Sequence, residues 1–108
     1  MSAAEPPLDV EIDPGFAPDD EEGRWTYAGG LTFANAGSVL AATKALTLPA
    51  RGDVDLDNIG AIDSSAVAVL VALARRASEE GRLLRFVRVP PALVALAEVY
   101  GVGEILGA

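Results

Sequence analysis

Two adjacent serines behind an aspartate, Asp63-Ser64-Ser65, are the residues of this chain whose types and spacing could carry chemistry. They stand between an apolar stretch typical of a strand and a longer apolar stretch typical of a helix. The first turn of a helix has unpaired backbone N–H groups and a partial positive charge, so it is stabilised by a capping side chain and also accepts a phosphate. The sequence therefore predicts either a plain helix cap or a modification site at residues 63–65.

Catalysis by these serines has little support in the rest of the chain. Histidine and cysteine are absent, which excludes a Ser-His-Asp triad, a cysteine nucleophile and imidazole or thiolate metal ligands. The neighbouring carboxylate of Asp63 is a weak activator of a serine. Gly101-Val102-Gly103 follows a predicted helix and lacks a third glycine, and no phosphate-binding loop signature occurs. We expect no catalytic residue, no cofactor and no enzymatic activity.

A second pattern, Asp53, Asp55 and Asp57, resembles the start of a calcium-binding loop. Such a loop needs glycine at its sixth position and glutamate at its twelfth, where this chain has Asn58 and Ser64. We interpret the three carboxylates as one solvated face of a strand and expect no bound metal.

Charge divides the chain into two parts. Residues 1–22 hold eight acidic residues and no basic one, together with four of the seven prolines, whereas the remainder holds eight of each sign. We expect a disordered acidic tail at 1–22 and one folded domain at 23–108. A neutral domain without a basic stripe is a poor nucleic-acid binder. With no signal peptide and no apolar run long enough to cross a bilayer, we expect a cytoplasmic protein without direct membrane insertion.

The elements that must position the serines follow from periodicity and turn residues. The predicted order is strand, strand, helix, strand, helix, strand, helix, which favours an α/β fold with a four-stranded, mostly parallel sheet and one incompletely covered face. The sequence predicts a hairpin of strands 24–28 and 31–33 around Gly29-Gly30, helices at 36–47, 64–80 and 91–100, and strands at 53–58 and 82–89.

The helix after Ser65 is apolar nearly all round over its first two turns. Ala68, Val69 and Ala72 add apolar surface whichever face is buried, which indicates either a docking face or an ordinary alanine-rich helix. Five arginines cluster along the end of this helix and the next strand, and two interpretations stay open for them: local pairs with Glu79, or contact with an acidic partner. These arginines are Arg75, Arg76, Arg82, Arg85 and Arg88.

Over residues 25–106 the chain resembles the STAS domain, the fold of anti-anti-sigma factors and of subunits of sulfate and lipid transporters. Residues 54–65 are similar to the family's strand and its Asp-Ser-Ser-Gly or Asp-Thr-Ala-Gly switch loop, with Ala66 in place of the usual glycine. Gly81 and the helix end at 96–102 match as well.

The resemblance implies two roles. In anti-anti-sigma factors the second hydroxyl, here Ser65, accepts a phosphate from a kinase partner. In the lipid-transporter members, a threonine at the position of Ser64 contacts an ABC-transporter ATPase. The Leu-Ala-x-x-Tyr pattern at 96–100 favours the MlaB-like lipid-transporter members.

We therefore expect a non-enzymatic regulatory subunit that docks on the ATPase of a bacterial ABC phospholipid transporter. The alternative is an anti-anti-sigma factor that an anti-sigma factor kinase phosphorylates at Ser65 or Ser64. A homodimer remains open. The predicted partner-binding residues are Asp63, Ser64, Ser65, Ala66, Ala68, Val69 and Ala72.

Overall fold

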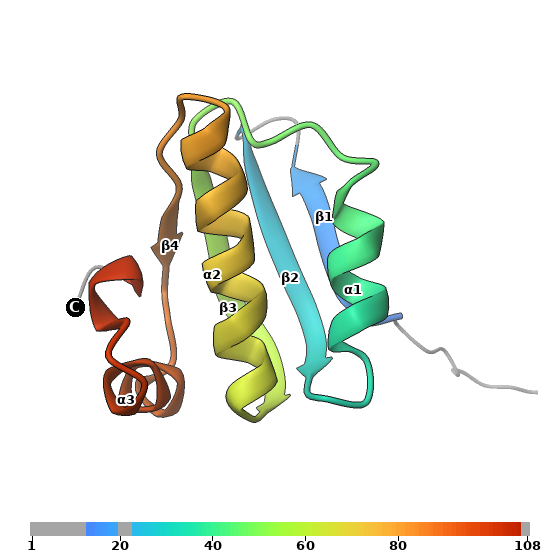
Figure 1. Ribbon diagram of the computed structural model, residues 1–108. Helices are drawn as coiled ribbons and strands as arrows, with labels where there is room; N and C mark the ends of the chain where they lie inside the picture. Colours follow the sequence, from blue (N-terminus) through green and yellow to red (C-terminus); the bar gives the residue numbers. More distant parts are fainter. Residues whose placement is uncertain (1–12, 20–22, 107–108) are drawn as a thin grey trace, which may run out of the picture.

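The computed structural model describes residues 13–19 and 23–106, which form one sheet with two helices packed on a single face (Figure 1). The α/β class, the four-stranded sheet and the three α-helices predicted from the sequence are confirmed. In chain order the elements are β1 (Gly15–Asp19), β2 (Arg24–Leu31), α1 (Ala36–Thr43), β3 (Asp53–Ile62), α2 (Ser64–Glu79), β4 (Arg85–Val87), α3 (Pro91–Val99) and the 3-10 turn η3 (Gly103–Leu106).

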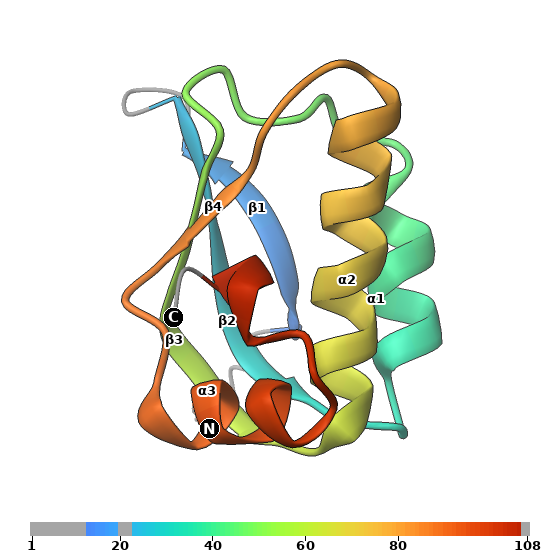
Figure 2. The ribbon, with the colours of Figure 1, turned by 60° about the vertical axis from the view of Figure 1, so that its left-hand side comes forward.

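The strands lie in their sequence order, β1-β2-β3-β4. β1 is antiparallel to β2, and the β2–β3 and β3–β4 pairs are parallel. Because both parallel connections step in the same direction across the sheet, right-handed crossovers place α1 and α2 on the same face. Figure 2 shows that arrangement, with α3 across one end of the sheet.

The core lies between this face and the helices. Trp25 and Tyr27 of β2 alternate with outward-facing neighbours, as do Val54 and Leu56 of β3, and all four are buried. They pack with the buried stripe of α2, which includes Leu70 and Leu73. Period-two strands thus meet a period-3.6 helix on one apolar surface.

The first two strands differ from the prediction. β2 runs without interruption through Gly29-Gly30, and the antiparallel partner is β1, inside the segment 1–22 predicted to be a disordered tail. The hairpin predicted around the two glycines is therefore wrong, as is the tail prediction for residues 15–19. Gly29 has a φ of 95° at an irregularity in the β2–β3 register, so the glycines form a bulge instead of a turn. Residues 1–12 and 20–22 lie outside the described residues.

Two other elements are shorter than predicted. α1 ends at Thr43, whose hydroxyl donates to the Leu40 carbonyl inside the helix. β4 has three residues, and it ends where Arg88 adopts a φ of 54°. A non-glycine residue in this left-handed region turns the chain out of the extended conformation.

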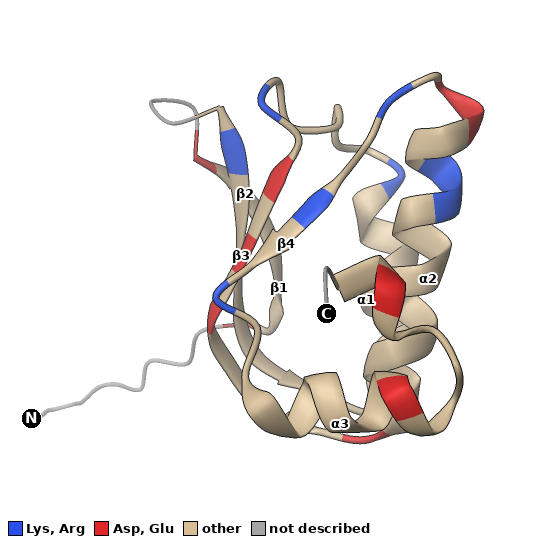
Figure 3. Cartoon of the chain, turned by 90° about the vertical axis from the view of Figure 1, so that its left-hand side faces the viewer, with Lys and Arg blue, Asp and Glu red and all other residues tan. Residues whose placement is uncertain are grey.

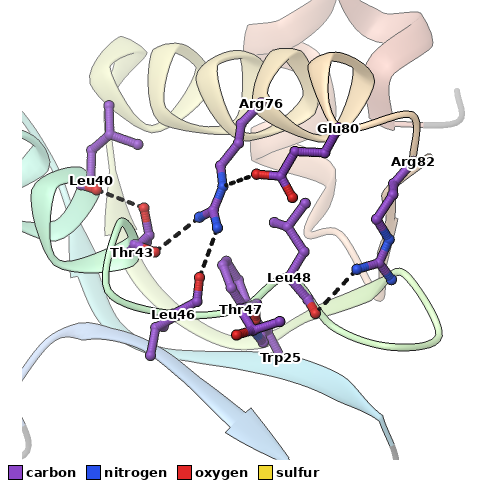
Figure 4. Close-up of polar contacts among 9 residues, drawn as sticks. All are labelled: Trp25, Leu40, Thr43, Leu46, Thr47, Leu48, Arg76, Glu80 and Arg82. Atoms are coloured by element: carbon purple, nitrogen blue, oxygen red, sulfur yellow. Dashed lines mark hydrogen bonds and ion pairs between the residues drawn. The ribbon is translucent and has the colours of Figure 1, made fainter.

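Arginine side chains hold the long loop between α1 and β3 (Figure 4). Arg76 of α2 donates to the carbonyls of Thr43 at 2.9 Å and Leu46 at 2.8 Å, and it pairs with Glu80. Arg82 donates to the carbonyls of Leu48, Pro49 and Ala50. The Thr43 carbonyl lies at the C-terminal end of α1, where the helix dipole is negative, and it also accepts from the Leu46 backbone N–H at 2.9 Å.

The opposite face of the sheet carries ion pairs between neighbouring strands. Arg85 pairs with Asp53 at 2.8 Å, while Arg88 and Arg24 both face Asp55. The hydrogen bond from Arg88 is the main cause that lowers the pKa of buried Asp55. Two carboxylates of the Asp-x-Asp-x-Asp pattern are thus bonded to arginines.

We expect Arg76→Leu to lower the free energy of unfolding by about 1.5–3 kcal/mol, because it leaves two carbonyls of the 43–46 segment without their charged donor. Urea denaturation at neutral pH measures the loss. The matched control is Arg75→Leu, one position earlier on the exposed side of α2, which should change stability by no more than about 0.5 kcal/mol. Equal losses in both variants would contradict the role given to Arg76.

Candidate docking site

The site is built around Asp63, which joins two loops at one end of the sheet. Asp63 follows β3 directly and is the N-cap of α2, with an extended backbone. Its Oδ1 accepts a hydrogen bond from the Ser65 backbone N–H at 2.8 Å. Its Oδ2 accepts from the Phe33 backbone N–H, in the loop between β2 and α1, at 3.0 Å. One side chain therefore caps the helix and fixes the neighbouring loop against it.

These contacts keep the carboxylate ionised. The Phe33 N–H, followed by the backbone and hydroxyl of Ser65, lowers the pKa of Asp63, and partial burial opposes them. The positive end of the α2 dipole acts in the same direction as the hydrogen bonds. A carboxylate whose pKa is lowered is a poor general base at neutral pH, so the geometry favours binding over activation of a serine.

Side-chain hydrogen bonds fix the backbone of the loop that carries Phe33. Asn35 accepts from the Thr32 backbone N–H and donates to the Gly30 carbonyl, each at 3.0 Å, and the Tyr27 hydroxyl donates to the same carbonyl at 2.7 Å. Asn35 is the N-cap residue of α1, but its side chain makes no capping bond to that helix. With its backbone held, the Phe33 side chain is 81% exposed.

Only some of the predicted partner-binding residues are accessible. Ser64 and Ala68 are exposed, and Asp63, Ser65 and Ala72 are half-buried. Ala66 and Val69 have exposed fractions of 0% and 2%, so the prediction that they contact a partner directly is wrong.

The reason for this correction is the period of α2. Residues 66, 69, 70, 73 and 77 fall on the side that packs against the sheet, whereas Ala68 and Ala72 fall on the other. The methyl group that stands where the family usually has glycine therefore points into the core, away from any partner.

A shallow groove of about 460 Å³ runs along the exposed side of α2 to the end of α3. Its floor and rim include Ser64, Ala68, Val71, Ala72, Arg75 and Tyr100. Tyr100, the last residue of the Leu-Ala-x-x-Tyr pattern, is 58% exposed. It is the C-cap of α3, one residue past the turn that packs on the core.

Sequence reasoning missed three surface residues: Phe33 beside the start of α2, and Arg75 and Tyr100 as residues that line the groove. A large aromatic residue next to a loop was the available signal for Phe33, but it was assigned to a strand. No group of three His, Cys, Asp or Glu side chains within residues 13–19 and 23–106 could hold a metal ion. No helix in the same ranges has the length and apolar character needed to cross a membrane.

Comparison with known protein families matches residues 15–107 to the family described as Mlab, STAS domain. The match covers nearly all of the described residues and includes β1, which the sequence had assigned to the tail. A search of curated proteins finds no relative at a significant level of similarity.

We expect Asp63→Asn to be less stable than the unmodified chain at pH 7, since the amide NH2 that replaces one carboxylate oxygen cannot accept the hydrogen bond from Ser65 or Phe33 that this oxygen received. The folded-state pKa of Asp63 lies below the unfolded value of about 3.9, so its stabilisation is complete above that pH and lost as the pH falls through the folded value. The difference in unfolding free energy between variant and unmodified chain should therefore shrink as the pH falls below about 3.9.

Urea denaturation at several pH values measures this gap. Glu79→Gln removes one negative charge at the opposite, exposed end of α2 and should stay within about 0.5 kcal/mol of the unmodified chain at pH 7. A gap for Asp63→Asn that is independent of pH would contradict the bridging role of the ionised carboxylate.

Proposed function

The chain belongs to the MlaB-like STAS domain family, a family of small regulatory protein-interaction domains, and from that premise we propose a specific partner. The protein is a non-enzymatic subunit that docks on the ATPase of a bacterial ABC phospholipid transporter. The observation that carries the proposal is the fixed, exposed start of α2. Ionised Asp63 holds Phe33 on one side and the helix on the other, and Ser64 stands exposed between them.

The different exposure of the two serines supports the transporter role over the phosphorylation role. Ser64 is exposed and corresponds to the family position that contacts the ATPase, whereas Ser65 is half-buried with its backbone N–H bonded to Asp63. A phosphate on Ser65 would add a charge of about −1.5 to −2 beside an ionised carboxylate. The helix dipole offsets part of that repulsion, but the cap that holds Phe33 would be disturbed.

Docking of this kind acts through differential affinity. A rigid surface that fits one conformation of the ATPase better than another shifts the ATPase toward that conformation, without any chemical step in this chain. The size of the effect equals the difference between the two binding free energies. A regulatory subunit of this type therefore needs a preformed surface, which the Asp63 bridge provides.

The first test is affinity capture from extracts of the native cells. We expect the unmodified chain and Ser78→Arg to recover an ABC ATPase with its permease, and Ser64→Arg to lose both, because a long charged side chain then replaces a small one at the contact. Ser78 is an exposed serine near the other end of the same helix and is thus the matched control. Recovery of an anti-sigma factor kinase would support the anti-anti-sigma role instead. Equal recovery of the ATPase by all three chains would contradict the docking site.

A second test concerns the exposed aromatic residue. Phe33 and Leu83 are both 81% exposed, but Leu83 lies in the connection between α2 and β4, away from the serines. We expect Phe33→Ala to weaken binding to the captured ATPase at least about tenfold, since aromatic anchors dominate interface energies, while Leu83→Ala leaves binding unchanged. Titration calorimetry measures both affinities, and urea denaturation checks that neither fold is weakened. Similar affinities for the two variants would remove Phe33 from the interface.

A further inference from the structure

The exposed side of α2 is a straight stripe with a hydroxyl at one end and a cation at the other. Because an α-helix turns about 100° per residue, Ser64, Ala68, Val71 and Arg75 fall within about 60° of one another. The first and last are separated by about 16 Å along the axis. The groove of about 460 Å³ follows this stripe, with Tyr100 on its rim. Figure 3 shows that charged positions on α2 occur only toward its C-terminal end.

Arg75 differs from the other arginines that the sequence grouped with it. Arg76 and Arg82 are bonded to loop carbonyls, Arg85 to Asp53 and Arg88 to Asp55. Arg75 makes no hydrogen bond or ion pair with any residue in the described ranges, although it is exposed and lines the groove. Internal contacts thus explain four of the five arginines and leave this one to be explained by what the groove binds.

We infer that the groove binds a partner helix of about three turns, whose apolar face carries an aspartate or glutamate that pairs with Arg75. This inference rests on the proposed docking function and adds the chemistry of the partner segment. A helix that starts at Ser64 and follows the stripe for about 16 Å reaches Arg75 after about eleven residues. The acidic residue is therefore expected near one end of the segment, about three turns from the residue that contacts Ser64.

The shape of the groove fits a helix. Ala68 and Ala72 project one carbon beyond the backbone, so a second helix can approach closely along them. Val71 and the ring of Tyr100 offer apolar surface on either side of the line of approach. In interfaces of this kind, the bound helix contacts the groove through apolar residues spaced i, i+3, i+4 and i+7.

The charge of the groove fits an acidic residue on that helix. A partner that covers the stripe removes water from Arg75, and a guanidinium that loses water without gaining an anion destabilises the complex. A carboxylate forms two parallel hydrogen bonds with a guanidinium and supplies that anion. A lone cation in an apolar groove is a poor fit to an anionic membrane, which is recognised by clusters of four or more basic residues.

The first experiment is photo-cross-linking in the native cells with p-benzoylphenylalanine placed in the full chain at Tyr100, at Ser64 or, as a control, at Leu83. We expect cross-links from the first two positions to one protein and none from the third. Mass spectrometry of the Tyr100 product should find an amphipathic helical segment that carries an Asp or Glu on the same face as the cross-linked residue.

The outcomes separate this inference from the proposed function. A cross-link from Ser64 alone, or a Tyr100 product without a nearby carboxylate, overturns the inference and leaves the ATPase proposal standing. An acidic amphipathic segment from a protein that is not an ABC ATPase supports the inference and overturns the proposed partner. The absence of cross-links from both positions overturns both.

The second experiment reverses the charge. The partner that cross-linking identifies is purified, and its affinity for Arg75→Glu should be at least about tenfold weaker than for the unmodified chain. Replacing the partner's acidic residue with arginine should restore the affinity for Arg75→Glu. Arg51→Glu makes the same change of charge at an exposed position outside the groove and should bind like the unmodified chain. Affinity for Arg75→Glu equal to that for Arg51→Glu would overturn the inference. Urea denaturation of both variants shows whether either charge reversal affects the fold.

Discussion

The docking end of the molecule depends on one carboxylate with two backbone donors. Asp63 binds the N–H of Ser65 in its own helix and the N–H of Phe33, thirty positions earlier, in the loop after β2. Without the first bond, α2 begins with an unsatisfied amide, and without the second, the β2–α1 loop has no tie to α2 at this point. Both bonds are strongest when the aspartate is ionised, and the bonds themselves keep it so. The cap, the loop and the charge therefore support one another.

At the other end of α2, arginines have the corresponding role. Arg76 and Arg82 donate to carbonyls of the 43–50 segment, and the Trp25 indole N–H adds a bond to the Thr47 carbonyl at 3.1 Å. Loops with few regular hydrogen bonds need such donors when their backbone lies against a core. α2 is thus held at its start by a carboxylate that accepts from N–H groups, and at its end by guanidinium groups that donate to carbonyls. The exposed and half-buried residues between these two ends, such as Ala68 and Ala72, take no part in these hydrogen bonds.

The sequence was sufficient for α2 and α3 because their signals are local. The Asp63 cap, the apolar period of residues 64–79 and Pro91 at the start of α3 each lie within a few positions of the feature they specify. The errors came from pairing. Gly29-Gly30 has the composition of a turn, but whether it forms a turn or a bulge depends on β3, which lies alongside it and is far along the chain.

The same distinction explains the errors at the site. Ser64 and Ser65 look equivalent in the sequence, but Ser64 is exposed and Ser65 is half-buried. The helical period predicts which residues share a side of α2, but only the structure shows which side packs on the sheet and buries Ala66 and Val69. Five arginines in 14 residues look like one basic patch. Four of them are bonded to groups that come from other elements, which no local pattern can specify.

A surface built this way is suited to discriminate between partner conformations. Ordering a loop or a side chain on binding opposes association, so a flexible site would lose affinity for every conformation of its partner. Here the backbone of Phe33, the cap of α2 and the helix behind the groove are already fixed by hydrogen bonds within the chain itself. The free energy of contact can then differ between partner states according to shape alone. In the proposed complex, Arg75 would require an opposing charge at one end of the groove, and this pairing would set the register of the partner segment along α2.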